Sequence, residues 1–135
     1  MTDGSVNHIG IATNSLDNSE ELWSILGFSP SIDQINKEQG VKIRYMEGGG
    51  RTRIELLEPL GDESPVGRFI ERHGPGVQQI AVNVEDIEST ITELTEMGVR
   101  MVSENPVMGS EGHRIAFVHP SSAGGVLIEL VESSV

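Results

Sequence analysis

Cysteine is absent from this chain, and basic side chains are few, with 9 lysines and arginines against 21 aspartates and glutamates. The lack of cysteine excludes a disulfide framework, a thiolate nucleophile and a cysteine-ligated zinc site. The formal charge of −12 at pH 7 disfavours nonspecific binding to nucleic acid or to an anionic membrane. Any chemistry must therefore use histidine, carboxylate, amide or hydroxyl groups.

Long apolar runs are also missing. No segment approaches the roughly 20 apolar residues needed to cross a bilayer, and the first residues, MTDGSVNHIG, lack the pattern of a secretion signal. We therefore expect a cytoplasmic protein that has neither a membrane nor a nucleic acid as its partner. A length of 135 residues, with 36% hydrophobic and 22% charged side chains, suits a single compact domain.

The chain contains an internal repeat. The segment 6–28, VNHIGIATNSLDNSEELWSILGF, aligns without a gap on 77–99, VQQIAVNVEDIESTITELTEMGV, at an offset of 71 (77 − 6). A second match joins IELLE at 54–58 to IELVE at 128–132, at an offset of 74 (128 − 54). Each half therefore predicts a strand, a helix and then several strands.

The helices are expected at 14–26 and 86–97, each closed by a glycine. Their apolar positions, which we expect to face the core, are Leu16, Leu22, Trp23 and Leu26 in the first and Ile87, Ile91, Leu94 and Met97 in the second. A shorter helix is expected within 61–76, capped by Asp62 or Ser64, with Pro65 in its first turn and Gly74 at its end.

The expected strands complete the modules. They read SPSIDQINKE, VKIRYM and RIELLEP in the first half, with a turn at the GGG of 48–50, and VRMV, HRIAFVHP and GVLIELVE in the second. The fold class is thus α+β, with two pseudo-symmetric βαβββ modules at about 5–60 and 77–133 and a linker helix between them. We expect one domain over 1–135, because neither module can bury its sheet face alone.

Strand alternation singles out polar residues that share a face within each module. The first strands contribute His8 and, at the equivalent place, Gln79; the last strands contribute Glu55 and Glu129. Alone, a histidine on a strand is usually a hydrogen-bonded core or surface residue, and the glutamates of IELLE could face water. The repeat favours a site instead, because polar residues recur at equivalent places in both halves.

Buried carboxylates are costly without a cation, and a divalent metal removes that cost. One imidazole nitrogen, two carboxylates and one amide oxygen suit a six-coordinate ion, most readily Co²⁺ or Mn²⁺, with Zn²⁺, Ni²⁺ and Mg²⁺ as alternatives. The predicted metal ligands are His8, Glu55, Gln79 and Glu129.

Several further segments are informative together: VNHIGIAT, EQGV, IELLEPL, GPGV before QQIAV, RIAFVHP and GGVLIELVE. This set of segments resembles the methylmalonyl-CoA epimerases. That family belongs to the vicinal oxygen chelate superfamily, with glyoxalase I, extradiol dioxygenases and bleomycin-resistance proteins. The resemblance covers nearly the whole chain. It implies a glyoxalase-like fold with a mixed-sheet, half-barrel metal-site cavity, and a homodimer.

The resemblance implies metal-dependent interconversion of (R)- and (S)-methylmalonyl-CoA through an enolate, with an acyl-CoA as the substrate. It makes His8, Glu55 and Glu129 metal ligands, and Glu129 also the catalytic proton donor or acceptor. The alternatives are another isomerase or lyase of the superfamily acting on a different substrate, and a metal-free homologue that binds a small molecule.

This chain departs from the family at two places. It has Gln78 and Gln79 where the family has two histidines, and Ile43 where well-studied members carry a glutamate that acts as the other base. The second proton carrier is therefore unassigned on sequence grounds. Water is one candidate, and the acidic residues near the right segments are Glu38, Glu47 and Glu111.

Two groups of basic residues have open roles. His113 and Arg114, in the segment 110–117, are candidates for binding the substrate, although an exposed loop is an equal reading. Lys37, Lys42, Arg44, Arg51 and Arg53 form the one basic concentration. They either steer the phosphates of CoA or pair with neighbouring acids.

Overall fold

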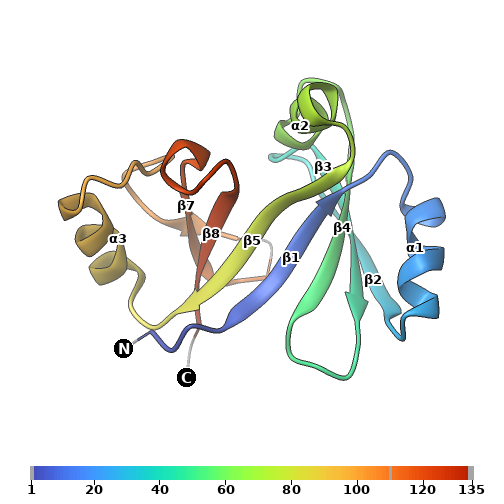
Figure 1. Cartoon of the computed structure of the whole chain (residues 1–135), viewed down its shortest axis with the longest axis horizontal. Coiled ribbons are helices and arrows are strands. Elements are labelled where there is room, and N and C mark those ends of the chain that lie inside the picture. The colour runs from blue at the N-terminus through green and yellow to red at the C-terminus, as the bar shows by residue number, and fades with distance from the viewer. Residues whose placement is uncertain (1, 110, 134–135) are drawn as a thin grey trace. The chain divides into compact units, whose positions relative to one another are not determined.

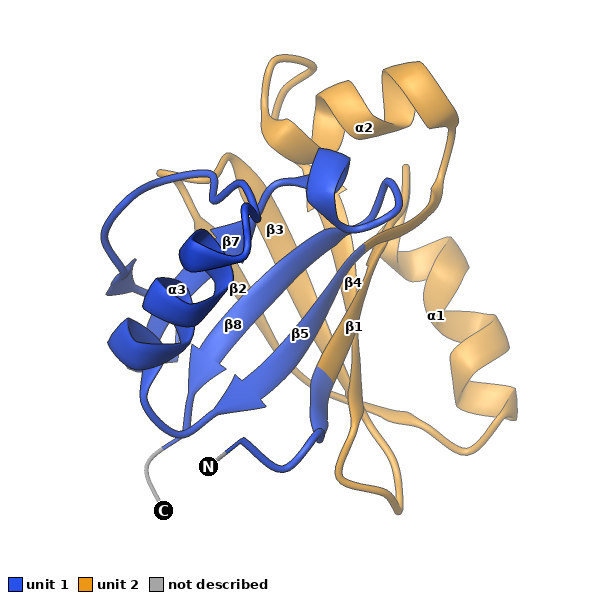
Figure 2. Cartoon of the chain, turned by 60° about the vertical axis from the view of Figure 1, so that its left-hand side comes forward, with its two compact units in different colours: residues 1–7, 79–135 blue, residues 8–78 orange. Residues whose placement is uncertain are grey.

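A computed structural model describes residues 2–109 and 111–133; Ser110, which begins the expected substrate-binding segment, lies outside the described residues. The chain forms two compact units (Figure 2). Unit 2 comprises residues 8–78, and unit 1 comprises residues 1–7 and 79–135. None of the helices among the described residues is long and apolar enough to cross a membrane.

Unit 2 contains a mixed sheet with two helices (Figure 1). Its elements are β1 (Val6–Ala12, whose first two residues belong to unit 1), α1 (Leu16–Ile25), β2 (Ser29–Asn36), β3 (Val41–Glu47), β4 (Arg53–Pro59) and α2 (Pro65–His73). The strand order is β2-β3-β4-β1. The first and last strands, β1 and β4, pair in parallel, whereas the other neighbours are antiparallel.

Unit 1 repeats this plan. Its elements are β5 (Gly76–Val84, whose first three residues belong to unit 2), α3 (Ile87–Glu96), β6 (Val107–Met108), β7 (Arg114–Val118), a short 3-10 helix η1 (Pro120–Ser122) and β8 (Leu127–Glu132). The strand order is β5-β8-β7-β6, with β5 and β8 parallel and the other pairs antiparallel. The α+β class with two βαβββ modules is thus confirmed.

One expected strand is wrong. The segment VRMV at 99–102 forms only an isolated bridge, Met101 to Val118, and the strand of this region is β6 instead. The backbone amide of Val102 donates to the carbonyl of Phe117, and that of His119 donates to Arg100. These bonds attach the segment to the end of β7, and no continuous ladder follows them.

The repeat extends to the starts of the helices. The carboxylate of Glu58, at the end of β4, accepts a hydrogen bond from the amide of Leu16 at 3.0 Å. In the other unit, Glu132 at the end of β8 accepts from Ile87 at 3.0 Å. A carboxylate favours the positive end of the helix dipole and satisfies an amide that has no partner within the helix. Each module therefore fastens its helix to its last strand in the same way.

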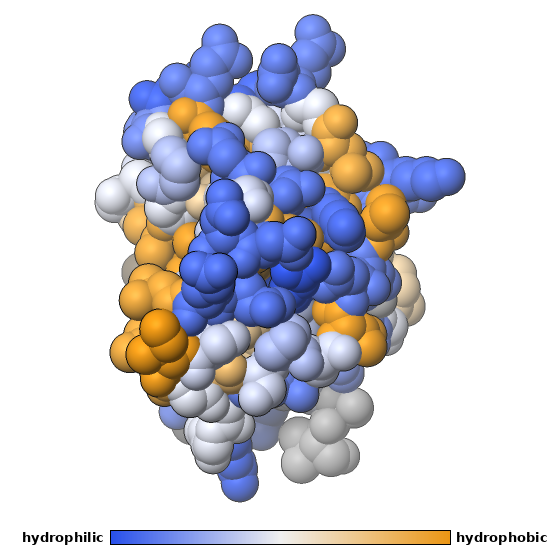
Figure 3. All heavy atoms as spheres, turned by 90° about the vertical axis from the view of Figure 1, so that its right-hand side faces the viewer, coloured by the Kyte–Doolittle hydropathy of each residue, from blue (hydrophilic) through white to orange (hydrophobic). Residues whose placement is uncertain are grey.

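The two helices are less buried than their apolar patterns predict. Leu16, Ile87 and Ile91 are buried, but Leu22 and Met97 are 59% and 79% exposed. Leu26 is exposed as well. A turn of about 100° per residue places Leu22 and Leu26 well round the helix from Leu16, so they miss the sheet. The view onto the α1 side accordingly shows apolar atoms beside hydrophilic ones (Figure 3).

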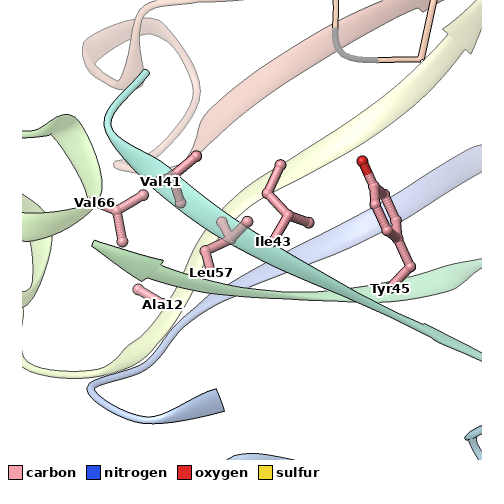
Figure 4. Close-up of a cluster of buried hydrophobic side chains, with 6 residues drawn as sticks. All are labelled: Ala12, Val41, Ile43, Tyr45, Leu57 and Val66. Carbon is pink, nitrogen blue, oxygen red and sulfur yellow. The ribbon is translucent and has the colours of Figure 1, made fainter. Parts of the chain in front are cut away.

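The helix α2 begins and ends as its sequence predicts. Ser64 caps it by accepting from the amide of Gly67, Pro65 occupies its first turn, and Gly74 ends it with φ +79°. Val66 is buried in the hydrophobic cluster drawn in Figure 4. An added Cβ at Gly67 would clash with the backbone carbonyl oxygens of Gly61 and Asp62. The helix therefore sits directly against the backbone that precedes it.

The contact at Gly67 reverses the usual effect of alanine. Alanine normally stabilises a helix interior by about 0.5–1 kcal/mol over glycine. Here we expect Gly67→Ala to destabilise the protein by roughly 1–3 kcal/mol, because backbone atoms cannot move aside cheaply. Urea unfolding measures the difference. Gly49→Ala is the matched control, since nothing lies within 4 Å of its added Cβ. Equal stability of the Gly67 variant and wild type would contradict this packing.

Candidate functional site

In unit 2 the site residues lie on the sheet face opposite α1. The residues of β1 and β4 that pack in one cluster with Leu16 of α1 are Ile9, Ile11, Ile54 and Leu56. The alternate residues, His8 and Glu55, therefore point to the other face. Cross-strand register adds Tyr45, which lies opposite Glu55, and Ile43, which lies opposite Leu57.

His8 and Glu55 form a buried pair. The imidazole Nδ1 lies 3.1 Å from Oε2 of Glu55, and each side chain is only 5% exposed. The same carboxylate oxygen accepts a hydrogen bond from Nη2 of Arg53 at 3.2 Å. The pair therefore places an imidazole and a carboxylate at one point of a buried surface, with a guanidinium beside them.

In unit 1 an equivalent pair forms. Nε2 of Gln79 donates to Oε1 of Glu129 at 3.2 Å, and Glu129 is buried. Ala81 and Glu129 are register partners across the parallel strands β5 and β8. Leu130, the next residue, packs in the cluster around α3, so Glu129 points to the face away from that helix.

Each unit thus brings its first-strand polar residue next to its last-strand carboxylate. Neither unit, within its described residues, joins three histidine, aspartate or glutamate side chains that could hold a metal ion by itself. The expected ligand set draws His8 and Glu55 from one unit and Gln79 and Glu129 from the other. Their assignment as metal ligands stays a prediction.

Gln78 lies on the opposite face of β5 from Gln79. It is 8% exposed, and its Oε1 has no hydrogen-bond partner among the described residues. Of the two adjacent glutamines, Gln79 is the one that contacts a carboxylate of the candidate site. Sequence alternation predicts this division correctly.

Position 43 is apolar and buried. Ile43 packs in the cluster with Val41, Tyr45 and Leu57 (Figure 4). It lies opposite Leu57, two residues from Glu55 on β4, and so shares the face of Glu55. No proton can be exchanged by this side chain. The other acidic candidates, Glu38, Glu47 and Glu111, are all exposed. The second proton carrier thus has no buried candidate among them.

The structure does not bring Arg114 to the face of Glu129. Its guanidinium binds both oxygens of Glu132, at 2.8 and 2.9 Å, and Nη1 lies 3.3 Å from Glu88 of α3. Ala116, two residues along β7, packs in the cluster around α3. His113 lies in the turn before β7 and is half-buried. Arg114 therefore supports α3.

The basic concentration of unit 2 is partly neutralised by acids. Arg44 binds Asp33 at 2.8 Å and Asp17 at 2.8 Å, and Lys42 lies 3.9 Å from Asp33. The guanidinium of Arg44 also holds the pKa of Asp33 below its ordinary value. For these residues the pairing with neighbouring acids is the correct reading. Arg53 differs, because it binds Glu55 of the candidate site.

Arg53 is the site residue that sequence reasoning misses. It was grouped with the other basic residues because of its charge. The signal that finds it is its place two residues before Glu55 on the same strand, since residues two apart share a face.

Comparison with known proteins places this geometry in a family. A model of the Glyoxalase/Bleomycin resistance protein/Dioxygenase superfamily matches residues 7–117. The mitochondrial methylmalonyl-CoA epimerase of Dictyostelium discoideum is 35% identical over 131 residues, which cover 96% of this chain and 78% of that protein. The chain belongs to the methylmalonyl-CoA epimerase family. The resemblance identified from the sequence motifs is confirmed.

Other members of the epimerase family agree. An ethylmalonyl-CoA/methylmalonyl-CoA epimerase of Cereibacter sphaeroides is 34% identical over 94% of this chain and 96% of its own length. The crystal structure of methylmalonyl-CoA epimerase from Mycobacterium tuberculosis matches with a TM-score of 0.90 and 38% identity, over 99% of this chain and 90% of that one. A methylmalonyl-CoA epimerase in complex with methylmalonyl-CoA and NH4+ matches with a TM-score of 0.88 and 36% identity, over 97% and 95%. The glyoxalase-like fold is thereby confirmed.

The ion pair of Glu132 predicts a pH-dependent stability. Arg114, and then the amide of Ile87, hold the pKa of Glu132 below its ordinary value. A carboxylate whose pKa is lower in the folded state stabilises the fold above the unfolded pKa of about 4.3 and loses that effect as the pH falls through the folded value. We therefore expect Glu132→Gln to lower the urea midpoint at pH 7 and to have less effect at about pH 3.

Urea unfolding of both proteins at the two pH values checks this. Glu104→Gln, at an exposed position of the loop before β6, is the control and should match wild type at both. An unchanged difference at the two pH values would show that the charge of Glu132 is not what stabilises α3.

Proposed function

We propose that this protein is a metal-dependent epimerase that interconverts (R)- and (S)-methylmalonyl-CoA by proton transfer at C2. The observation that supports it most is the repeated pair, His8 with Glu55 and Gln79 with Glu129, each with a buried carboxylate. Relatives over nearly the full length carry the name of this activity. One matching structure is a complex with methylmalonyl-CoA.

The chemistry of the donors fits a divalent cation. Buried carboxylates favour a bound cation, because each charge has lost its hydration. His8 offers a nitrogen, and Glu55 and Glu129 offer anionic oxygens. Gln79 contacts Glu129 through its amide nitrogen, which makes its oxygen the ligand atom. This oxygen-rich set suits Co²⁺ or Mn²⁺ better than a closed zinc site. When bound, the ion supplies electrophilic stabilisation of the negative charge that develops on the thioester oxygen.

The chain's own side chains transfer the C2 proton and exclude water. Glu129 takes the proton from C2, since its carboxylate is buried and held in place by Gln79. The bulky Ile43 and its apolar neighbours exclude water from the face they cover. Because Ile43 carries no proton, the return of a proton to the other side of C2 uses another group or a water molecule.

The homodimer and the cytoplasmic location expected from the sequence belong to this proposal. Light scattering of the purified protein tests the homodimer, for which we expect a mass of twice 14.6 kDa.

Hydrogen exchange tests the reaction directly. We expect one epimer of methylmalonyl-CoA, incubated in deuterated water with the protein and Co²⁺, to exchange its C2 proton and to racemise. Glu129→Gln should slow both processes by at least about a hundredfold, the usual contribution of a general acid–base. Glu132→Gln is the matched control on the same strand, because its carboxylate binds Arg114 and the start of α3. It should keep the wild-type rate while folded.

Other outcomes separate the alternatives. Exchange of ethylmalonyl-CoA but not of methylmalonyl-CoA would indicate a different acyl substrate, which the double name of the Cereibacter sphaeroides relative makes worth measuring. No exchange above the metal-free rate with any of the proposed ions would contradict the epimerase. A stoichiometric ion retained by wild type and lost in Glu129→Ala would contradict a metal-free binding protein.

A further inference from the structure

Arg53 is held on two sides within unit 2. Its Nη2 donates to Glu55 at 3.2 Å, and its guanidinium carbon lies 5.2 Å from the centre of the Tyr45 ring. Tyr45 is itself buried, and its hydroxyl donates to Oε1 of Gln34 at 2.8 Å. A cation–π contact with a buried, hydrogen-bonded ring restrains the position of the guanidinium.

Arg53 is the one lysine or arginine on this face among the strands of unit 2. Lys42 and Arg44, the basic residues of β3, have Glu58 and Leu56 as register partners and so lie on the α1 face. The Arg53 side chain is 20% exposed, whereas Glu55 beside it is 5% exposed. A fixed cation therefore reaches the accessible part of the face that carries His8 and Glu55.

The charge of Arg53 changes what this face can bind. It already balances Glu55, so a divalent cation held by that carboxylate keeps more of its positive charge for a further ligand. A guanidinium also has five N–H donors in a planar fork, which suits carboxylates. This face therefore favours a ligand that brings a negative charge of its own.

The proposed reaction has such a ligand. Its acyl group carries a free carboxylate on the carbon that loses the proton, and removal of that proton adds a second negative charge nearby. A cation fixed before the reaction lowers the cost of this charge without reorganisation. An acyl group without the carboxylate gains less from the same cation.

We propose that Arg53 is a specificity residue of this site, which selects acyl-CoA thioesters whose acyl group carries a free carboxylate over thioesters that lack one. This inference rests on the proposed acyl-CoA substrate, and it adds to the candidate site a residue that contacts Glu55 and Tyr45.

Paired binding measurements test the selection. Methylmalonyl-CoA and propionyl-CoA differ by the carboxylate, and calorimetry in the presence of Co²⁺ gives a Kd for each. We expect wild type to bind methylmalonyl-CoA at least about tenfold more tightly, as expected for a charge-assisted contact. In Arg53→Gln this preference should fall to within about threefold, with the Kd of propionyl-CoA nearly unchanged.

Two variants control for charge and fold. Arg51→Gln removes the same charge from the exposed turn before β4 and should keep the full preference. Arg53→Lys keeps the charge but loses the fork and the flat surface on Tyr45, and should lower the preference about threefold. If Arg53→Gln does not fold, the lysine variant decides, and an unchanged preference there overturns the proposal.

The outcomes distinguish this proposal from the function it rests on. If wild type binds neither thioester and exchanges no C2 proton, the epimerase proposal fails and this one with it. If wild type exchanges the proton but Arg53→Gln weakens both thioesters equally, Arg53 only supports Glu55 and the specificity role is overturned. Loss of the preference in Arg53→Gln, with the preference kept in Arg51→Gln, supports it.

Discussion

The parallel pairing of the first and last strand in each unit is the constraint on which the site depends. In unit 2 it sets β1 beside β4, and in unit 1 it sets β5 beside β8. A helix packs on one face of each pair, and the polar residues of the candidate site lie on the other face. His8 meets Glu55, and Gln79 meets Glu129, as a direct result of this register.

Burial makes these carboxylates chemically significant. A carboxylate removed from water must be matched by a cation or by hydrogen bonds, and the two units do this differently. Glu55 has an imidazole and the guanidinium of Arg53 on the same oxygen, and Glu129 accepts a hydrogen bond from the amide of Gln79. The repeat therefore produces equivalent carboxylate positions whose first-strand neighbours differ, an imidazole in one unit and an amide in the other.

The same carboxylate chemistry also builds the scaffold. Glu58 and Glu132 lie three residues beyond the site glutamates and bind the first amides of α1 and α3. Their strand places them at the start of a helix, where a negative charge is stabilising. Two glutamates of the same strand thus have different roles: one lies in the candidate site, and the other, three residues later, binds the start of a helix.

Much of this was readable from the sequence. The offset of 71 predicted the two modules, alternation predicted the faces of His8, Gln79 and Gln78, and Ser64, Pro65 and Gly74 predicted the limits of α2. These features depend on local periodicity and backbone preference, which neighbouring residues determine. Leu22, Leu26 and the segment 99–102 were mispredicted, because helix rotation and strand pairing depend on which partner is in reach.

The sequence by itself therefore determined the repeat, the elements and the residue types available for chemistry. Tertiary structure alone decided which charges meet: Arg114 turns to Glu132 beside α3, and Arg53 turns to Glu55 over the ring of Tyr45. Both are arginines on strands of the two modules, and their charge alone does not show which acid each of them binds. The difference arises because electrostatic pairing follows distance in space, which strand register fixes between residues far apart in the chain.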